Sequence, residues 1–353
     1  MTTLQEVARL RLVAQRLAGP PLPDAAEAVR WLTAVQGQDF PGVLTSVGLR
    51  TADRSRKGVE AALDDGAVVR SWPMRTTLHL VAAEDLGWLL ELCGPRVLAG
   101  AAKRRATLGL TETDTERARE LALAELSGGR RLGRAALLAV LDAGGVATAG
   151  QRGYHLLWYL AQTGTLCLGP MGDGEQQFVL SAEWIRTPRR LAGEAALREL
   201  ALRFFRSHGP ATVADLARWA GLKITDVRAG LAAARDELTP LDVEGTEHWM
   251  DPGTPGLLEQ ARKEAAGVLL LPGFDEFVLG YADRRCAVDP QFADRIVPGG
   301  NGMFRATVVS DGRVLGTWRW TGRGVRRTVA AEPFTEFPGP VAEAIPRVAG
   351  TLP

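Results

Sequence analysis

The sequence is poor in the residues that most often build metal sites and nucleophilic sites. Its 353 residues include three cysteines, Cys93, Cys167 and Cys286, which lie far apart. Their odd number and wide spacing argue against a disulfide framework and against a cysteine-rich zinc site. The four histidines show no ligand spacing with cysteine or with one another. We therefore expect no metal and no organic cofactor.

The chain also lacks long apolar runs and the common nucleotide-binding and nucleophile motifs. No run approaches the roughly 20 apolar residues that cross a bilayer, and Glu6 and Arg9 lie where a signal peptide would be apolar. We expect a cytoplasmic protein with no membrane partner. There is no Gly-x-Ser-x-Gly elbow, no phosphate-binding Gly-Lys-Ser/Thr loop and no dinucleotide fingerprint, which removes most common enzyme classes.

Overall charge is nearly absent as well. The formal net charge is +1, with 46% hydrophobic and 24% charged residues, which is typical of an ordinary globular protein. The length suffices for about two to four domains. Any affinity for nucleic acid must come from local basic patches, because the global field is weak.

The most informative stretch is Gln36-Gly37-Gln38. An amphipathic pattern predicts a helix from Asp24 to Val35, with Asp24 as N-cap. Gly37 breaks this helix, so that the two glutamines flank a bend and their amides can converge on one point. Two primary amides supply four N–H donors and two carbonyl acceptors and do not titrate. The alternative is a polar helix C-terminus without chemistry.

The element order favours an α+β protein with winged helices. Helix, helix and a two-stranded hairpin follow one another three times, which is the order of a winged helix-turn-helix module. From Ala266 onward the pattern changes to strands, with Ser310–Arg313 as a hairpin turn, and predicts a small antiparallel β-barrel. The predicted domains are a first winged helix with extra helices, a second and a third winged helix, and the barrel, at 1–128, 129–191, 192–262 and 263–353.

Three separated blocks resemble the AlkZ/YcaQ group of winged-helix DNA glycosylases. They are Val35–Gln38, Arg70–Leu80 and Leu271–Arg284. The first is similar to the catalytic Gln-x-Gln signature of the group, although Gly37 stands where a bulkier residue is usual. The other two mark the wider superfamily. The resemblance implies three tandem winged helices and a C-terminal β-barrel that form a C-shaped cleft around duplex DNA. It also implies excision of N-alkylated purines and, in some members, unhooking of crosslinks.

Gln36 and Gln38 are the predicted catalytic residues. Alkylation at N7 puts a positive charge on guanine, so the base leaves neutral and needs no acid. The transition state is oxocarbenium-like, as in glycoside hydrolysis. What remains is to position a water and to stabilise positive charge, and an amide oxygen does both without ionising.

Two arginine-bearing hairpins are the candidate DNA-binding segments. The stretch 318–327 combines two tryptophans with arginines and contains no acid, which suits phosphate contacts or groove insertion. The alternative is a solvated charged hairpin. Arg75 and His79 lie on the predicted first wing, where they contact DNA or else form a buried polar network. The predicted DNA-binding residues are Arg75, His79, Arg319, Arg323, Arg326 and Arg327.

The adjacent carboxylates Asp275 and Glu276 are predicted to be structural. On a strand they point to opposite faces and cannot form one paired site. We expect one of them to form a salt bridge with Arg284 that links the barrel to the helical part, through a strand at Phe274–Arg284.

Together these features predict a monomeric, monofunctional DNA glycosylase that acts on duplex DNA with alkylated purines. Its substrate would be bulky or crosslinked N7-alkylguanine, in DNA repair or in self-resistance to a DNA-alkylating natural product. The main alternative is a non-catalytic winged-helix DNA-binding protein or regulator. A regulator usually gains specificity from dimerisation, and the sequence shows no coiled-coil heptads. A protein-interaction scaffold, the third possibility, would not need the arginine hairpin.

Overall fold

The chain folds into two compact units, one of them discontinuous in sequence. The computed structural model describes residues 2–322, 324 and 327–353. The first unit comprises Met1–Val59 with Leu197–Pro353, and the second comprises Glu60–Ala196. The chain passes between the two in α4 (Arg56–Asp64) and in α11 (Gly193–His208).

The second unit is built on antiparallel strands in the order β3-β2-β4-β5. Arg75 and Thr76 join β2 to β3 with φ values of 54° and 66°, as a tight primed hairpin turn requires. The strands are β2 (Val68–Met74), β3 (Thr77–Ala82), β4 (Leu166–Gly172) and β5 (Glu175–Leu180). The helices are η1 (Ala83–Asp85), α5 (Leu86–Gly100), α6 (Ala102–Thr107), α7 (Glu112–Leu126), α8 (Arg134–Ala143), α9 (Arg152–Gln162) and α10 (Ser181–Trp184).

The first unit combines helices with a sheet in the order β11-β10-β9-β8 and a separate hairpin of β6 and β7. Its strands are β1 (Val35–Gln36), β6 (Thr239–Val243), β7 (Thr246–Met250), β8 (Val268–Leu271), β9 (Thr307–Ser310), β10 (Arg313–Thr321) and β11 (Thr328–Pro333). Its longer helices are α1 (Leu4–Ala14), α2 (Ala25–Leu32), α3 (Phe40–Gly48), α12 (Val213–Ala220), α13 (Ile224–Ala234), α14 (Thr254–Ala265) and α17 (Gly339–Ala349). Short turns complete it at η2 (Arg235–Glu237), α15 (Glu276–Leu279), η3 (Pro290–Phe292), α16 (Ala293–Ile296) and η4 (Pro298–Gly300).

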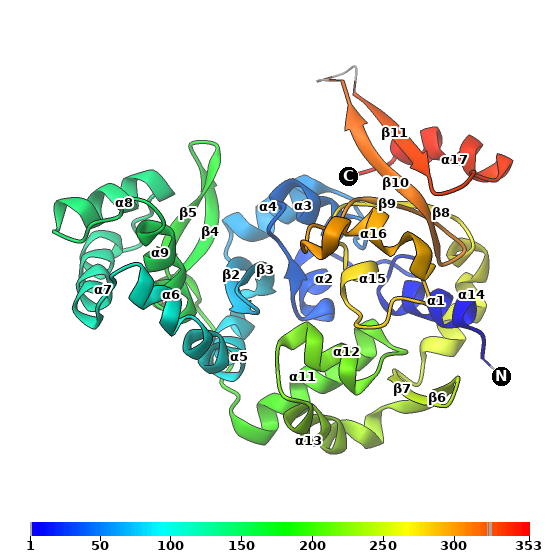
Figure 1. The fold of residues 1–353 in the computed structure, drawn as a ribbon, viewed down its shortest axis with the longest axis horizontal. Coiled ribbons are helices and arrows are strands. Elements are labelled where there is room, and N and C mark those ends of the chain that lie inside the picture. The colour runs from blue at the N-terminus through cyan, green and yellow to red at the C-terminus, as the bar shows by residue number, and fades with distance from the viewer. Residues whose placement is uncertain (1, 323, 325–326) are drawn as a thin grey trace. The chain divides into compact units, whose positions relative to one another are not determined.

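The predicted C-terminal β-barrel is wrong. Over the residues that the structure describes, β8 to β11 form an open antiparallel sheet, in which β8 and β11 are the edges. The helix α17 packs against both of these edge strands. It lies along the sheet in Figure 1, where β10 and β11 extend beyond it as a long hairpin. Covering the sheet with a helix is an alternative to closing it, since either one protects exposed edges.

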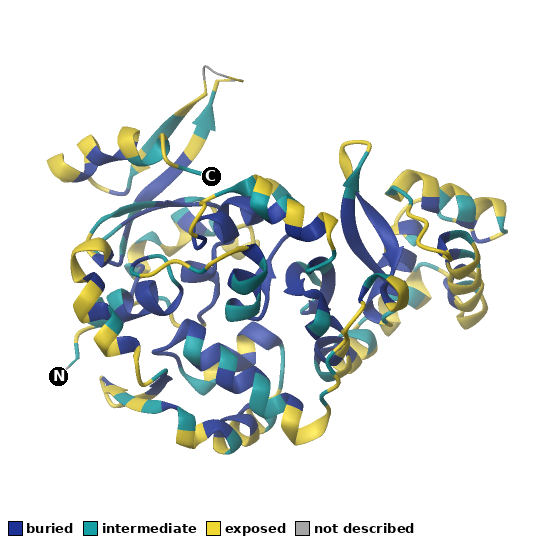
Figure 2. Cartoon of the chain, turned by 180° about the vertical axis from the view of Figure 1, so that it is seen from behind, coloured by how far each residue is buried: buried dark blue, intermediate teal, exposed yellow. Residues whose placement is uncertain are grey.

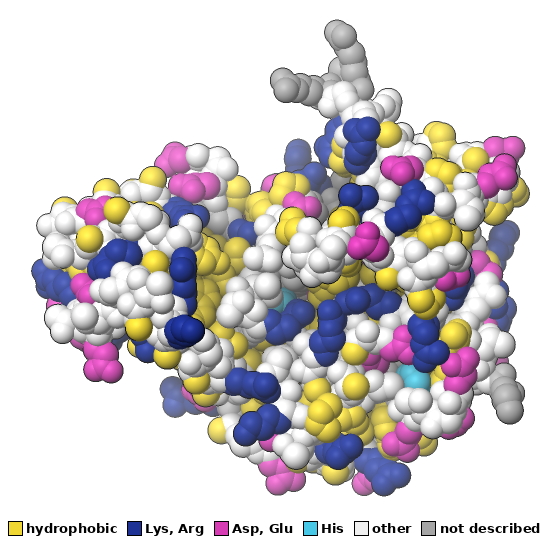
Figure 3. All heavy atoms as spheres, in the orientation of Figure 1, with side chains coloured by type: hydrophobic (Ala, Val, Ile, Leu, Met, Phe, Trp, Pro, Cys, Tyr) yellow, Lys and Arg dark blue, Asp and Glu magenta, His cyan; other side chains and the backbone are white. Residues whose placement is uncertain are grey.

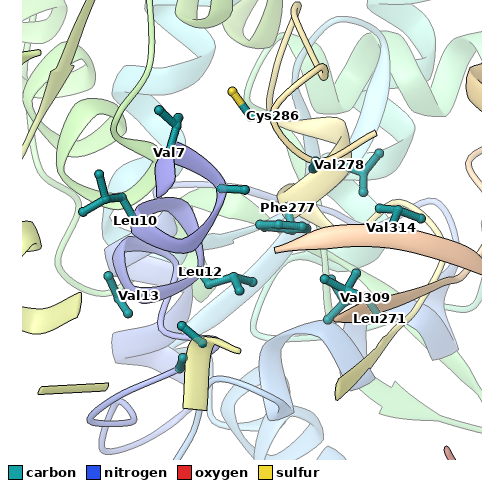
Figure 4. Close-up of a cluster of buried hydrophobic side chains, with 14 of the residues drawn as sticks. Val7, Leu10, Leu12, Val13, Leu271, Phe277, Val278, Cys286, Val309 and Val314 are labelled. Atoms are coloured by element: carbon teal, nitrogen blue, oxygen red, sulfur yellow. The ribbon is translucent and has the colours of Figure 1, made fainter. Parts of the chain in front are cut away.

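The core of the first unit joins its N-terminal helix to this sheet. Val7, Leu10 and Leu12 of α1 lie among Phe277 and the strand residues of the sheet (Figure 4). The β9–β10 turn also contacts α1, where Arg9 pairs with Asp311. The predicted hairpin turn at Ser310–Arg313 is confirmed, with β9 and β10 paired on either side of it.

The helix–helix–hairpin order that the sequence predicts is present along the chain. α8 and α9 precede the β4–β5 hairpin, and α12 and α13 precede the β6–β7 hairpin. The capping box of Thr212 and Asp215 begins α12, and Gly221 ends it with φ 72°, since glycine tolerates that region. Local capping residues therefore account for both ends of α12.

Candidate active site

Gln36 and Gln38 contact each other across Gly37. The amide Nε2 of Gln36 donates to Oε1 of Gln38 at 3.3 Å, and the backbone N–H of Gln38 donates to Oε1 of Gln36 at 3.1 Å. The predicted convergence of the two amides is thus confirmed. The predicted helix boundary is wrong, because α2 ends at Leu32 and Thr33 has φ 69°. The chain has already left the helix when it reaches Gln36.

The two glutamines differ in exposure. Gln36 is 4% exposed, whereas Gln38 is exposed and lines a pocket of about 740 Å³ in the first unit. The buried Gln36 therefore supports Gln38 through hydrogen bonds, and Gln38 lines the pocket. The other lining residues are Asp39, Pro41, Gly42, Thr45, Arg56, Pro272, Gly273, Phe274, Met303, Phe304, Ala306, Trp318, Arg319, Trp320 and Arg327.

Glu276 fixes the backbone of the segment Gln36-Gly37-Gln38, called the glutamine turn below. Its Oε1 accepts from the backbone N–H of Gln36 at 3.0 Å, and its Oε2 accepts from the indole N–H of Trp219 at 2.9 Å. Nε2 of His208 lies 3.6 Å from the same Oε2. Glu276 is fully buried, so this carboxylate is committed to holding its neighbours and does not face solvent.

Asp275 belongs to a different network, and its predicted partner is wrong. Its carboxylate accepts from both terminal nitrogens of Arg50 at 2.9 Å and from the hydroxyl of Ser46 at 2.6 Å. It also caps the short helix α15 by accepting from the N–H of Phe277. Arg284, the partner that the sequence suggested, instead donates to the carbonyl of Val278.

The predicted strand at Phe274–Arg284 is also wrong. Asp275 is the N-cap of α15, and Glu276 is its first residue. Phe274 has φ 62°, which turns the chain sharply before the helix. This turn, and not strand alternation, sends the two carboxylates to different partners.

The arginine hairpin forms the other wall of the glutamine pocket. The indole N–H of Trp318 donates to the carbonyl of Leu271 at 2.8 Å and anchors β10 to β8. The guanidinium of Arg327 lies 3.9 Å from the ring centre of Trp320. Burial lowers the pKa of Arg327, with Arg56 adding to the shift. Figure 3 shows basic side chains gathered along this hairpin, and Figure 2 shows its distal part as less buried than the sheet.

The remaining predicted DNA-binding residues fall into two groups. Arg323 and Arg326 lie outside the described residues. Arg75 and His79 lie in the second unit, where Nη2 of Arg75 is 3.0 Å from Nε2 of His79. Nδ1 of His79 is 2.8 Å from the carbonyl of Thr77, and the ring is fully buried. The buried polar network that the sequence allowed is therefore present in this hairpin.

The sequence reasoning missed several residues of the pocket. Asp39 is its only described carboxylate, Arg56 adds a positive charge, and Phe304 forms part of the wall. Asp39 directly follows Gln38 and was the easiest to find. Gly42 also belongs here, since a Cβ at that position would lie 2.3 Å from Oδ2 of Asp39. Arg56 and Phe304 gave no local signal, because only the tertiary fold brings them to Gln38.

Metal binding and thiol reactivity depend on how the described His, Cys, Asp and Glu side chains are placed and buried. Within the described ranges, no group of three or more His, Cys, Asp and Glu side chains is placed to hold a metal ion. Burial raises the pKa of Cys93 and of Cys167 to about 12, which suppresses the reactive thiolate. The helices among the described residues are too short or too polar to span a bilayer.

Comparison with known proteins gives a consistent result. The DNA glycosylase AlkZ-like family matches residues 29–352. An interstrand DNA cross-link repair glycosylase of Streptomyces sahachiroi is 28% identical over 332 residues, covering 89% of this chain and 87% of that protein. The solved structure of Streptomyces sahachiroi DNA glycosylase AlkZ has a TM-score of 0.81 at 25% identity, covering 99% of this chain and 97% of that one. The chain belongs to the AlkZ-like family of DNA glycosylases.

Proposed function

We propose that this DNA glycosylase hydrolyses the N-glycosidic bond of bulky or crosslinked N7-alkylguanine in duplex DNA. The observation that carries the proposal is the hydrogen-bonded pair of Gln36 and Gln38, which presents one amide to a pocket. An amide pair suits a base that is already cationic, because such a base needs no proton in order to leave. A relative of this chain is named for interstrand DNA cross-link repair, which supports this substrate class.

We assign a separate task to each residue around Gln36-Gly37-Gln38. Gln38 holds a water by its amide, while Gln36 and Glu276 keep that amide in place. The water oxygen bonds to C1′ as the bond from C1′ to N9 breaks. The electron pair of that bond neutralises the alkylated ring, and the water proton passes to solvent. Asp39 adds a negative charge beside the developing oxocarbenium ion, which favours the transition state.

Hydrolysis without a lyase step fits the composition of the pocket. None of its described lining residues is a lysine, and a lysine amine is the usual partner for a Schiff base with the opened sugar. We infer a monofunctional enzyme on this ground.

We assign DNA contact first to the basic hairpin at 318–327. Arg319 and Arg327 line the same pocket as Gln38, so phosphate contacts there would hold the reacting nucleotide near the amide. Arg323 and Arg326 of the same stretch, and Arg75 and His79 of the other hairpin, stay predictions. So do the three tandem winged helices, the four-part domain division and the C-shaped cleft.

The cellular setting is a separate part of the proposal. We infer a cytoplasmic monomer that acts in DNA repair or in self-resistance to a DNA-alkylating natural product. The name of the relative supports the repair role. Neither property affects the chemistry assigned to the glutamine pair.

A base-release assay tests the proposal. Duplex DNA carrying one N7-methylguanine is incubated with the wild-type protein and with the Gln36→Ala/Gln38→Ala double variant. We expect free N7-methylguanine from the wild type and little from the variant. If the wild type releases no base from any N7-alkylated duplex while it still binds DNA, the non-catalytic winged-helix alternative is correct.

A further inference from the structure

The first unit contains a second pocket, which shares a wall with the glutamine pocket. Its volume is about 510 Å³, and Phe304 lines both pockets. The walls include Val278 and Val288, with backbone from Gly300 and Gly302. The charged residues that line it are Arg218, Arg284, Arg285 and Asp294.

Arg284 brings into this pocket a cation that has no salt-bridge partner among the described residues. Its Nε donates to the carbonyl of Val278 at 2.8 Å, and its guanidinium lies 4.9 Å from the ring centre of Phe304. Nη2 is buried and makes no hydrogen bond. Burial lowers the pKa of Arg284 to about 10; Arg218 adds to the shift and Asp215 partly opposes it.

Arg218, which is exposed, lies close enough to Arg284 to influence its pKa. Its Nη1 donates to the carbonyls of Leu279 at 3.4 Å and Tyr281 at 3.1 Å. Neither arginine forms a salt bridge with any residue that the structure describes. Arg284 is partly buried whereas Arg218 is exposed, so the cost of an unpaired charge in the free protein falls mainly on Arg284.

The nearby carboxylates are committed elsewhere. Asp215 accepts from the backbone N–H of Thr212 in the α12 capping box and from that of Ala282, and it lies 3.9 Å from Nη2 of Arg11. Asp294 accepts from the N–H of Gly299, and Arg285 is paired with Asp283. The free donors of Arg218 and Arg284 are therefore available to an anion from outside the chain.

We propose that Arg218 and Arg284 bind a backbone phosphodiester of the DNA strand that is held at the glutamine pocket. Guanidinium forks match phosphate oxygens and make charge-assisted hydrogen bonds to them. The shared Phe304 wall places this phosphate near the reacting nucleotide, and that part of the inference rests on the proposed function. The two arginines thus select a position on the backbone and do not read a base.

Single methylphosphonate substitutions along a duplex test this assignment, because each one removes the charge of one phosphate. The duplex is prepared with and without one N7-methylguanine, and affinity is measured for the wild type, Arg218→Gln and Arg284→Met. We expect one linkage at which the wild type loses about tenfold in affinity. In both variants that position should have little further effect, and the slope of log affinity against log salt should fall by roughly 0.9.

Arg228→Gln is the matched control, since this exposed arginine of α13 lines neither pocket. It should keep the wild-type methylphosphonate profile. Arg284→Met fills a similar volume without the unpaired charge, so its melting temperature should be unchanged or raised. A wild-type profile in both variants, with intact melting curves, overturns the proposal.

Two further outcomes separate this inference from the proposed function and from a free anion. A protein that releases no base but shows the arginine-dependent linkage on undamaged DNA supports the phosphate site while the proposed function fails. Melting is also measured in inorganic phosphate against chloride. Arginine-dependent stabilisation by phosphate, with no arginine-dependent linkage in DNA, means that the site takes a free anion, and it overturns the assignment to DNA.

Discussion

Asp275 and Glu276 are neighbours in the sequence, and both are buried, yet they act on different parts of the first unit. Asp275 forms a buried salt bridge with Arg50 and accepts a hydrogen bond from Ser46. Glu276 accepts from the backbone of Gln36 and the indole of Trp219. The first arrangement stabilises the packing of α3 against α15, and the second holds the turn that carries the glutamine pair. Burial of a carboxylate alone thus does not reveal its task; its donors do.

The largest effect should come from breaking the Asp275 network. Asp275→Ala leaves the Arg50 guanidinium buried without its partner, which typically costs about 3–5 kcal/mol of folding free energy. Chemical denaturation should show this loss. DNA affinity of the folded fraction should change little. If stability is unchanged while base excision disappears, Asp275 belongs to the active site and the contrast with Glu276 is wrong.

A smaller, differently placed effect is expected at Glu276. Glu276→Gln replaces one acceptor oxygen by a donor, so that either Gln36 or Trp219 loses its acceptor. We expect the single-turnover rate of base release to fall about tenfold, or about 1.4 kcal/mol of barrier. DNA affinity, measured separately by titration, should stay the same, because the change displaces the glutamines and leaves the DNA-binding arginines in place. Equal losses in rate and affinity would indicate general unfolding of the pocket instead.

The hairpin arginines should affect affinity and leave the chemical step unchanged. Replacing Arg319 and Arg327 by Ala should lower the slope of log affinity against log salt by roughly 0.9 for each phosphate contact. The same measurement on Arg323→Ala/Arg326→Ala extends the test to the tip. Arg347→Ala, an exposed change on α17 that lines neither pocket, is the control. An unchanged slope in the hairpin variants would remove this hairpin from the DNA interface.

The smallest effect concerns pH and stability. Burial lowers the pKa of His155 in the second unit and of His248 in the first below the ordinary value of 6.5. The unfolded chain therefore binds more protons below pH 6.5, and the free energy of unfolding falls as the pH drops through that range. We expect the melting temperature to fall by a few degrees as the pH is lowered from about 7 to about 5. His155→Gln should weaken this dependence, and a melting temperature that rises on acidification would contradict the assignment.

Local signals were sufficient for the glutamine turn and for most elements. The amides of Gln36 and Gln38 contact each other as predicted, although the preceding helix ends earlier than its pattern indicated, and the turn at Ser310–Arg313 formed as its residues required. Contacts that depend on the tertiary fold could not be predicted from the sequence. Asp275 pairs with Arg50, which lies 225 residues away in the sequence. The strand pattern of the C-terminal part also did not show whether the sheet closes into a barrel. Phe304 joins two pockets, although its own neighbours in sequence predict only a strand.

The central claim is that Gln36 and Gln38 carry the chemistry and not the affinity. Single-turnover release of N7-methylguanine from a defined duplex, at saturating protein, tests it most directly when affinity is measured in parallel. Each of Gln36→Ala and Gln38→Ala should raise the barrier by ~2–4 kcal/mol with little change in affinity. The double variant should lose less than the sum, since the amides act on one water.

Two features of the same experiment separate the amides from titrating groups. The wild-type rate should be nearly flat between about pH 6 and pH 8, where a histidine base would show a slope, because amides do not ionise. Asp39→Asn serves as the comparison, because it neutralises the one described carboxylate of the pocket. It should lower the rate of base release less than either glutamine variant does. Wild-type rates in Gln36→Ala and Gln38→Ala, with the loss confined to Asp39→Asn, would contradict the account.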